Sequence, residues 1–236
     1  MGIGILQSPE VTAAEGAERW EMESLRESAG WNPENFAREQ IRGLVRQVFL
    51  SNGARPVRQV VFSSVEPETD MPGLCRWVGE ALATQTPGTV AVVGSYPRLL
   101  QGSEKKPAES AERGATENGM PLRQIAARVR GNLWLVPNGE RGGGPITSAG
   151  LHSYLGEARR EFEYSIIQGP DAGKSDAATA MAQFADGIIL VLSAQRTRRA
   201  AALKIKAGLE AAQVRILGAV LSDRAFPIPE AIYRRL

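Results

Sequence analysis

Residues 60–75 read VVFSSVEPETDMPGLC, an apolar strand, a polar loop and the start of a helix in immediate succession. A helix that begins directly after a buried strand points its first backbone N–H groups at the loop, and phosphate groups commonly bind there. A phosphate-binding loop in this position needs glycines and a lysine. Residues 64–70 contain neither. The stretch therefore predicts the architecture of a nucleotide-binding protein without the glycines and the lysine that bind phosphate.

Apolar segments of strand length recur along the chain, separated mostly by stretches with helical spacing. The expected strands span residues 57–63, 88–94, 132–137, 164–168, 186–194 and 214–222, and the expected helices span residues 34–50, 72–84, 120–129, 146–162, 175–185, 197–212 and 229–236. Continuous apolar strands that alternate with helices form a parallel sheet covered on both faces. The sequence thus predicts the α/β class, with a single doubly wound, mainly parallel sheet and helices on both faces.

Composition limits the kinds of site that the chain can form. Its one cysteine, Cys75, and one histidine, His152, provide neither an internal disulfide nor a zinc site. The first residues lack the basic and apolar regions of a signal peptide, so we expect none, and we expect no bilayer-spanning segment. A net charge of +2 argues against nucleic-acid binding. We expect a metal-free cytoplasmic protein with a largely flexible segment at 1–32 and one domain at 33–236, which contains a mobile loop at 101–119.

A series of segments also resembles a known family. In chain order they are AREQIRGLVRQVFLSNG (37–53), RQVVFSSVEPETDMPGLCRWVGEALA (58–83), GNLWLVPNGE (131–140), FEYSIIQGPDAGKSDAATAMAQFADGIILVLSAQRTRRAA (162–201) and RILGAVLSDR (215–224). Together they resemble the cytoplasmic kinase domain of bacterial tyrosine kinases of capsule and exopolysaccharide synthesis, relatives of the MinD- and ParA-type P-loop ATPases. The resemblance implies a P-loop fold and a partner such as a polysaccharide co-polymerase or another membrane component of an exopolysaccharide system.

At the functional positions the match with this family fails. Met71 stands where the family has the phosphate-binding lysine, Pro72 where it has the magnesium-binding serine, and Gln168 where it has the Walker B aspartate. Met71 carries no charge, Pro72 has no N–H, and neutral Gln168 cannot hold magnesium as an aspartate does. The resemblance places the vestigial nucleotide site at Ser64, Glu66, Thr69, Asp70, Met71, Pro72, Gly94, Arg98 and Gln168.

A second loop favours nucleotide binding at first sight. Residues 169–175 read GPDAGKS between a predicted strand and a predicted helix, which is the context of a Walker A motif, although the spacing is one residue short. Asp223 is the only carboxylate that could then act as Walker B. The simpler interpretation is that Ser175 caps the helix, Asp176 lies in its first turn and Lys174 is exposed to solvent.

Three further residue types have ordinary structural interpretations. His152 is expected on the surface of an amphipathic helix rather than as a catalytic base. Cys75 is expected to be a buried and unreactive helix residue. Trp77 and Trp134 are expected in the core.

These observations favour a catalytically inactive regulator or scaffold of exopolysaccharide or capsule biosynthesis and export, without a cofactor. The protein would be cytoplasmic, or peripheral at the inner membrane through a partner. The alternative is an active ATP-dependent protein tyrosine kinase or ATPase that uses ATP and Mg²⁺ at an unusual site, such as residues 169–175. A third hypothesis, a MinD-like positioning protein at the membrane, lacks a long amphipathic terminal helix.

The resemblance also implies a homo-oligomer. In the family, a Glu-x-x-Arg helix packs against the nucleotide-site face of a neighbouring subunit. Glu39 and Arg42 keep this spacing, and Arg46 follows the position of the next family arginine. These side chains would meet an acidic loop, Glu66, Glu68 and Asp70, in a second copy. The alternative is a solvent-exposed helix whose charges pair among themselves.

Overall fold

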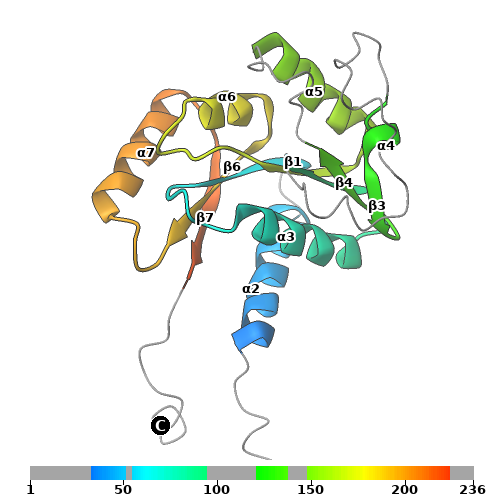
Figure 1. The fold of residues 1–236 in the computed structure, drawn as a ribbon, viewed down its shortest axis with the longest axis horizontal. Helices are drawn as coiled ribbons and strands as arrows, with labels where there is room; N and C mark the ends of the chain where they lie inside the picture. Colours follow the sequence, from blue (N-terminus) through cyan, green and yellow to red (C-terminus); the bar gives the residue numbers. More distant parts are fainter. Residues whose placement is uncertain (1–32, 52–54, 95–120, 138–147, 224–236) are drawn as a thin grey trace, which may run out of the picture. The chain divides into compact units, whose positions relative to one another are not determined.

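The computed structural model describes residues 33–51, 55–94, 121–137 and 148–223 (Figure 1). The chain divides into two units, residues 1–40 and 41–236, and the whole sheet belongs to the second. The segments that we expected to be flexible, 1–32 and 101–119, and the expected helix at 229–236 lie outside the described residues.

A seven-stranded sheet forms the centre of the second unit. Its strands are β1 (Gln59–Ser64), β2 (Val90–Gly94), β3 (Ala127–Arg130), β4 (Leu133–Pro137), β5 (Tyr164–Gln168), β6 (Gly187–Ser193) and β7 (Ile216–Ser222). They are ordered β3-β4-β2-β5-β1-β6-β7, and every neighbouring pair is parallel except the antiparallel pair of β3 and β4. The predicted fold class is confirmed.

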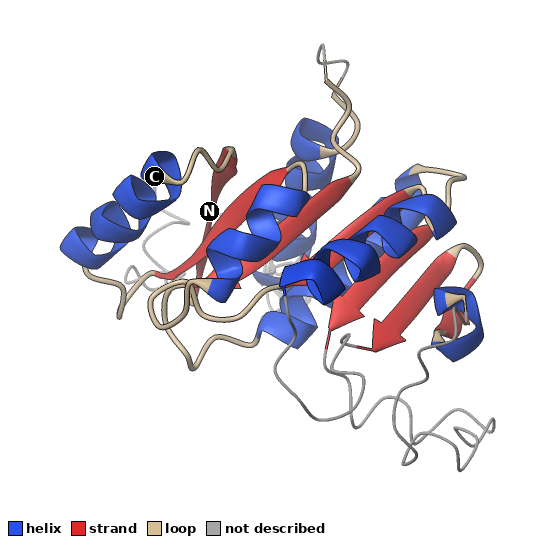
Figure 2. Ribbon diagram, turned by 90° about the horizontal axis from the view of Figure 1, so that it is seen from above, coloured by secondary structure: helices blue, strands red, loops and turns tan. Residues whose placement is uncertain are grey.

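Helices lie on both sides of the sheet, as the view from above shows (Figure 2). They are α2 (Pro33–Val48), α3 (Met71–Gln85), α4 (Leu122–Ile125), α5 (Ser148–Glu161), α6 (Ala177–Phe184) and α7 (Arg199–Ala211). One apolar cluster joins the sheet to α3 and to Val45 and Val48 at the end of α2, and a second cluster joins the other face to α4, α5, α6 and α7. None of the helices among the described residues is long and apolar enough to cross a membrane.

The expected helix at 120–129 was wrong in its second half. Helix α4 ends at Ile125, and β3 follows as an edge strand that pairs with β4. The two strands are joined by Gly131 and Asn132, and Gly131 has a φ of 46°. Two-residue hairpin turns favour glycine and asparagine because the turn needs positive φ. This turn signal was present in the sequence and outweighs the helical spacing.

Helix α3 shows why one expected core residue is exposed. Its buried residues Cys75, Val78, Gly79 and Leu82 follow the spacing of one helical face. Trp77 lies two positions after Cys75, which is about 200° around the helix, and 47% of its surface is exposed. The expectation that Trp77 lies in the core was therefore wrong, whereas Trp134 on β4 is half-buried.

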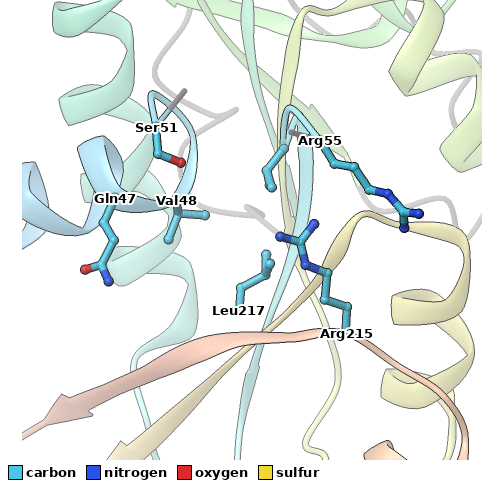
Figure 3. Close-up of a pocket in the computed structure, with 7 residues that line it drawn as sticks. Gln47, Val48, Ser51, Arg55, Arg215 and Leu217 are labelled. Atoms are coloured by element: carbon cyan, nitrogen blue, oxygen red, sulfur yellow. The ribbon is translucent and has the colours of Figure 1, made fainter. Parts of the chain in front are cut away.

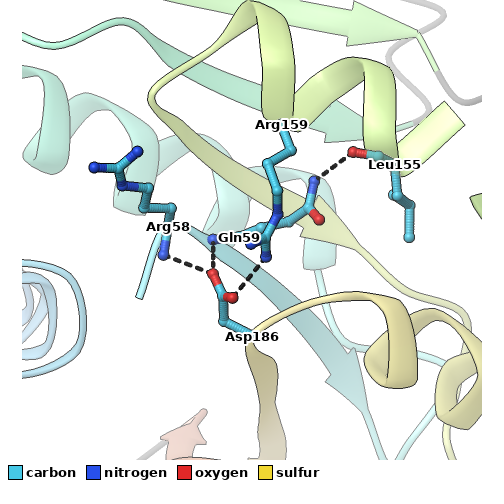
Figure 4. Close-up of polar contacts among 5 residues, drawn as sticks. All are labelled: Arg58, Gln59, Leu155, Arg159 and Asp186. Atoms are coloured by element: carbon cyan, nitrogen blue, oxygen red, sulfur yellow. Dashed lines mark hydrogen bonds and ion pairs between the residues drawn. The ribbon is translucent and has the colours of Figure 1, made fainter. Parts of the chain in front are cut away.

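A polar cluster ties together the amino ends of two strands and one helix (Figure 4). The Asp186 carboxylate, directly before β6, accepts hydrogen bonds from the backbone N–H groups of Arg58 and Gln59, both at 2.8 Å. Its other oxygen pairs with the Arg159 guanidinium of α5 at 2.6 Å. The buried Gln59 side chain donates to the Leu155 carbonyl at 3.0 Å. Side chains thus hold the start of β1 to the start of β6 and to α5.

We expect Asp186→Ala to lower the free energy of unfolding by about 3 kcal/mol. The change removes a charged acceptor and leaves the N–H groups of Arg58 and Gln59 without their partner. Urea denaturation measures the loss. Asp176→Ala is the matched control, because Asp176 is exposed and makes no capping hydrogen bond. Equal stability of the two variants would show that the cluster is dispensable.

Candidate functional site

The predicted site residues end neighbouring strands of the sheet. Ser64 is the last residue of β1, Gln168 of β5 and Gly94 of β2, and these strands are adjacent and parallel. Their carboxyl ends therefore lie at one edge, which is where ligands bind in open α/β sheets. The structure brings these three residues together at that edge, whereas Arg98 lies outside the described residues.

The first turn of α3 is capped by the protein's own carboxylate. Asp70 is the N-cap residue, and its Oδ1 accepts a hydrogen bond from the Gly73 N–H at 3.0 Å. The Met71 N–H donates to the Thr69 carbonyl at 2.8 Å, and Pro72 has no N–H. A helix N-terminus attracts negative charge and offers unpaired donors. Here the Asp70 carboxylate supplies the negative charge and accepts a hydrogen bond from one of these donors.

Met71, which the sequence resemblance aligns with the family lysine, belongs to the core. Only 4% of its surface is exposed, and it packs in the apolar cluster formed with α3 and the sheet. A buried methionine side chain fills space in an apolar core and stabilises it by packing. The methionine therefore contributes to the stability of the fold, and the position supplies no charge to the loop.

The remaining loop residues make few contacts with cationic groups. Glu68 forms an ion pair with Arg196, and both side chains are mostly exposed, so the pair contributes little to stability. The Thr69 hydroxyl and the Gln168 amide oxygen are buried and have no hydrogen-bond partner among the described residues. Gln168 thus presents an uncharged acceptor at the position that the sequence resemblance aligns with a metal-binding carboxylate.

Backbone N–H groups of the second loop, residues 169–175, are already used by the protein. The Gly169 N–H donates to the Phe62 carbonyl at 2.8 Å, and the Ala172 N–H donates to the Ser64 carbonyl at 2.9 Å. The N–H groups of Lys174 and Ser175 both donate to the Asp171 carbonyl, at 3.0 and 3.1 Å. The Asp171 carboxylate in turn accepts from the Ser64 hydroxyl at 2.6 Å. A phosphate cradle requires these N–H groups to point at the ligand, so the loop would have to be rebuilt before it could bind one.

Asp223 makes its contact with another strand end and not with that loop. It follows β7, which is separated from β5 by β1 and β6. The Asp223 carboxylate instead accepts a hydrogen bond from the Ser193 hydroxyl at 3.1 Å. The N-cap residue of α6 is Asp176 and not the expected Ser175, although the Ser175 hydroxyl accepts from the Ala177 N–H at 3.1 Å. Lys174 is exposed, as expected.

No metal centre forms among the described side chains. They contain no group of three or more histidine, cysteine, aspartate or glutamate residues that could hold a metal ion. His152 is exposed on α5, with its ring 4.9 Å from that of Phe184. This exposure agrees with the expected surface position of His152.

Cys75 is fully buried in α3, as expected. Burial, with a smaller contribution from the charge of Asp70, raises the pKa of the Cys75 thiol from 9.0 to about 12. The thiol is therefore protonated at neutral pH and unreactive in the folded protein. We expect iodoacetamide to modify Cys75 only after the protein unfolds, and rapid modification of the native protein would contradict this.

The raised pKa of Cys75 also predicts a pH dependence of stability. Below pH 9 the folded and unfolded states both hold the proton. As the pH rises from 9 towards 12, the unfolded chain loses the proton first, so the free energy of unfolding falls, by at most about 1.4 kcal/mol per pH unit. Urea denaturation at about pH 8 and about pH 10.5 should show a steeper loss for the wild type than for Cys75→Ala.

Comparison with known proteins finds similar structures but no similar sequence. No protein-family model and no curated protein matches the sequence. Among solved structures, the kinase domain of Escherichia coli tyrosine kinase ETK is similar, with a TM-score of 0.59, 16% sequence identity and coverage of 82% of this chain and 79% of that chain. The chimerical protein CapA2B2 has a TM-score of 0.59, 17% identity and coverage of 78% and 83%.

A cell-division protein has a similar structure as well. MinD of Aquifex aeolicus has a TM-score of 0.55 and 16% identity, and the match covers 75% of this chain and 72% of that chain. At these identities the likeness concerns the fold and not the chemistry of the site. The chain therefore has the P-loop type of α/β fold that bacterial tyrosine kinase domains and MinD share.

Proposed function

We propose that this protein is a catalytically inactive, tyrosine-kinase-like regulator or scaffold in exopolysaccharide or capsule biosynthesis and export. The observation that carries the proposal is the hydrogen bond from the Gly73 N–H to the Asp70 carboxylate at the start of α3. This carboxylate satisfies the helix N-terminus in place of a phosphate.

The residues around Asp70 disfavour the binding of a nucleotide triphosphate and of Mg²⁺. A triphosphate would have to displace the Asp70 carboxylate and approach Glu66 and Glu68, which repel it. The buried Met71 offers no cation, and Gln168 offers no negative oxygen for Mg²⁺. The protein accordingly works without ATP and without a metal cofactor.

The cellular setting is suggested by two lines of similarity. The ordered sequence segments resemble the kinase domains of capsule and exopolysaccharide systems, and the fold is similar to that of several tyrosine kinase domains. A protein of this fold without catalysis would act by binding. Its partner in this proposal is a polysaccharide co-polymerase or another membrane component, which holds it at the inner membrane.

Genetic complementation tests the proposal. Deleting the gene should reduce exopolysaccharide, and wild type, Lys174→Ala and the control Lys204→Ala should restore it equally. Lys174 is the only lysine in residues 169–175, and both lysines are exposed, so both variants should fold. The tagged protein should also co-purify with a membrane component of the polysaccharide system. A failure of Lys174→Ala alone would indicate an active nucleotide site.

Self-association is part of the proposed scaffold. Glu39, Arg42 and Arg46 are exposed on α2, and each is engaged within the chain; Arg46 Nε donates to the Gln85 side chain at 2.9 Å. An acidic loop of a second copy would compete with these internal contacts, so the contact should be weak and sensitive to salt.

We expect concentration-dependent association in analytical ultracentrifugation at low salt that decreases at high salt. Arg42→Glu combined with Arg46→Glu should give a monomer, because like charges would then face Glu66 and Glu68 of the neighbour. Arg198→Glu combined with Arg199→Glu is the control with the same change in charge on α7. A monomer at every concentration, or equal association of both variants, would exclude this contact.

A further inference from the structure

A polar hollow lies at the end of the sheet opposite the Asp70 loop. It is formed where α2 ends and where β1 and β7 begin, and its volume is ≈ 390 Å³. Seven residues line it: Gln47, Val48, Ser51, Arg55, Val57, Arg215 and Leu217. Ligands of open α/β sheets bind at the carboxyl ends of the strands, so this hollow at the amino ends is distinct from the site described above.

Two arginines give the hollow its charge. Arg55 and Arg215 both line it, and its lining contains no carboxylate. Within the part of the chain that the structure describes, neither arginine forms an ion pair. Figure 3 shows the Arg215 guanidinium pointing towards the space between the end of α2 and β1, whereas Arg55 lies on the same side as Arg215 and extends its guanidinium away from that space. Guanidinium groups remain charged at every physiological pH, so the hollow attracts an anion.

Uncharged residues complete the lining. Gln47 and Ser51 add an amide and a hydroxyl, which can donate hydrogen bonds to anionic oxygens. Val48 and Val57, which are 8% and 6% exposed, and the half-buried Leu217 supply apolar surface. A ligand that suits both kinds of surface has an anionic head and a small apolar body.

We propose that this hollow binds an organic monophosphate. A phosphate monoester is nearly a dianion at pH 7, which suits a hollow lined by two arginines and no carboxylate, and its oxygens match the fork of the Arg215 guanidinium. Its organic part would cover Val48, Val57 and Leu217. The inference is independent of the proposed scaffold function, because the two sites lie at opposite ends of the strands.

The end of α2 offers a competing explanation for Arg215. Helix carboxyl ends carry partial negative charge and attract cations, so the guanidinium could lie there without any ligand. Among the described residues, the Arg215 guanidinium donates no hydrogen bond to a carbonyl group of α2. Ligand titration separates the two explanations, because a guanidinium that only neutralises the helix end would bind no anion in a saturable way.

The test is a calorimetric titration at physiological ionic strength with phenyl phosphate, inorganic phosphate and benzoate. We expect phenyl phosphate to bind more tightly than inorganic phosphate, because its ring buries apolar surface, and more tightly than the monoanion benzoate. Arg215→Ala and Arg55→Ala should each weaken phenyl phosphate binding roughly tenfold or more. Arg199→Ala, which removes an exposed arginine at the start of α7, should leave binding unchanged.

Arg215→Lys is a second variant that tests the same side chain in case Arg215→Ala does not fold. It keeps the positive charge and loses the fork, so binding should lie between wild type and Arg215→Ala. Thermal unfolding confirms that each variant is folded. The proposal is overturned if phenyl phosphate does not saturate the wild type, if Arg215→Ala binds it as well as Arg199→Ala does, or if benzoate binds as tightly as phenyl phosphate.

Discussion

Restoring the chemistry of the loop before α3 is expected to create an affinity for ATP that the wild type lacks. The variant combines Glu68→Gly, Asp70→Gly, Met71→Lys and Pro72→Ser. It removes the carboxylate that caps α3, frees the Gly73 N–H and supplies the lysine and the hydroxyl. A ligand that binds only the folded state raises its stability, by about 2.7 kcal/mol at a concentration one hundred times the dissociation constant.

The restored variant should be less stable than the wild type before ATP is added. Met71 is 4% exposed, so a lysine there loses core packing and must extend its ammonium group to the loop. A control variant that keeps Met71 and carries the other three changes should gain less affinity. If saturating ATP leaves the unfolding temperature of the restored variant unchanged, the assignment of this loop as a former phosphate site is wrong.

The wild type should form no phosphotyrosine during prolonged incubation with ATP and Mg²⁺. Transfer of a phosphoryl group needs a bound triphosphate and a metal held by carboxylates, and the Asp70 cap and the neutral Gln168 remove both. Mass spectrometry of the intact protein detects each added phosphate, with an active bacterial tyrosine kinase as the positive control. Phosphotyrosine that accumulates in the wild type and is lost in Lys174→Ala would identify residues 169–175 as an active site.

Most of the fold was predictable because its strands are continuously apolar and its helices amphipathic. The strand expected at 164–168 agrees with β5 at both ends, and the other five expected strands differ from the structure by no more than two residues at either end. β3 was missed because four residues, three of them exposed, carry no burial pattern. Trp77 was misplaced because a large aromatic residue was assumed to be buried without regard to its position on the helical face.

The sequence proposes candidate site residues, but it could not predict their contacts. Alignment placed Asp70 and Met71 in the loop. The hydrogen bond of Asp70 to Gly73 and the burial of Met71 depend on how α3 packs on the sheet. An aspartate with a proline two residues later is consistent with a helix start, so the sequence did contain a signal for the Asp70 cap. Arg55 and Arg215 are distant in sequence, and only the pairing of β6 between β1 and β7 brings them to one hollow.

Calorimetric titration of the wild type with ATP and ADP, with and without Mg²⁺, tests the central claim most directly. The capped helix, the missing lysine and the neutral Gln168 predict that neither nucleotide binds more tightly than millimolar and that Mg²⁺ makes no difference. A dissociation constant in the micromolar range for either nucleotide, above all one that depends on Mg²⁺, would contradict the account.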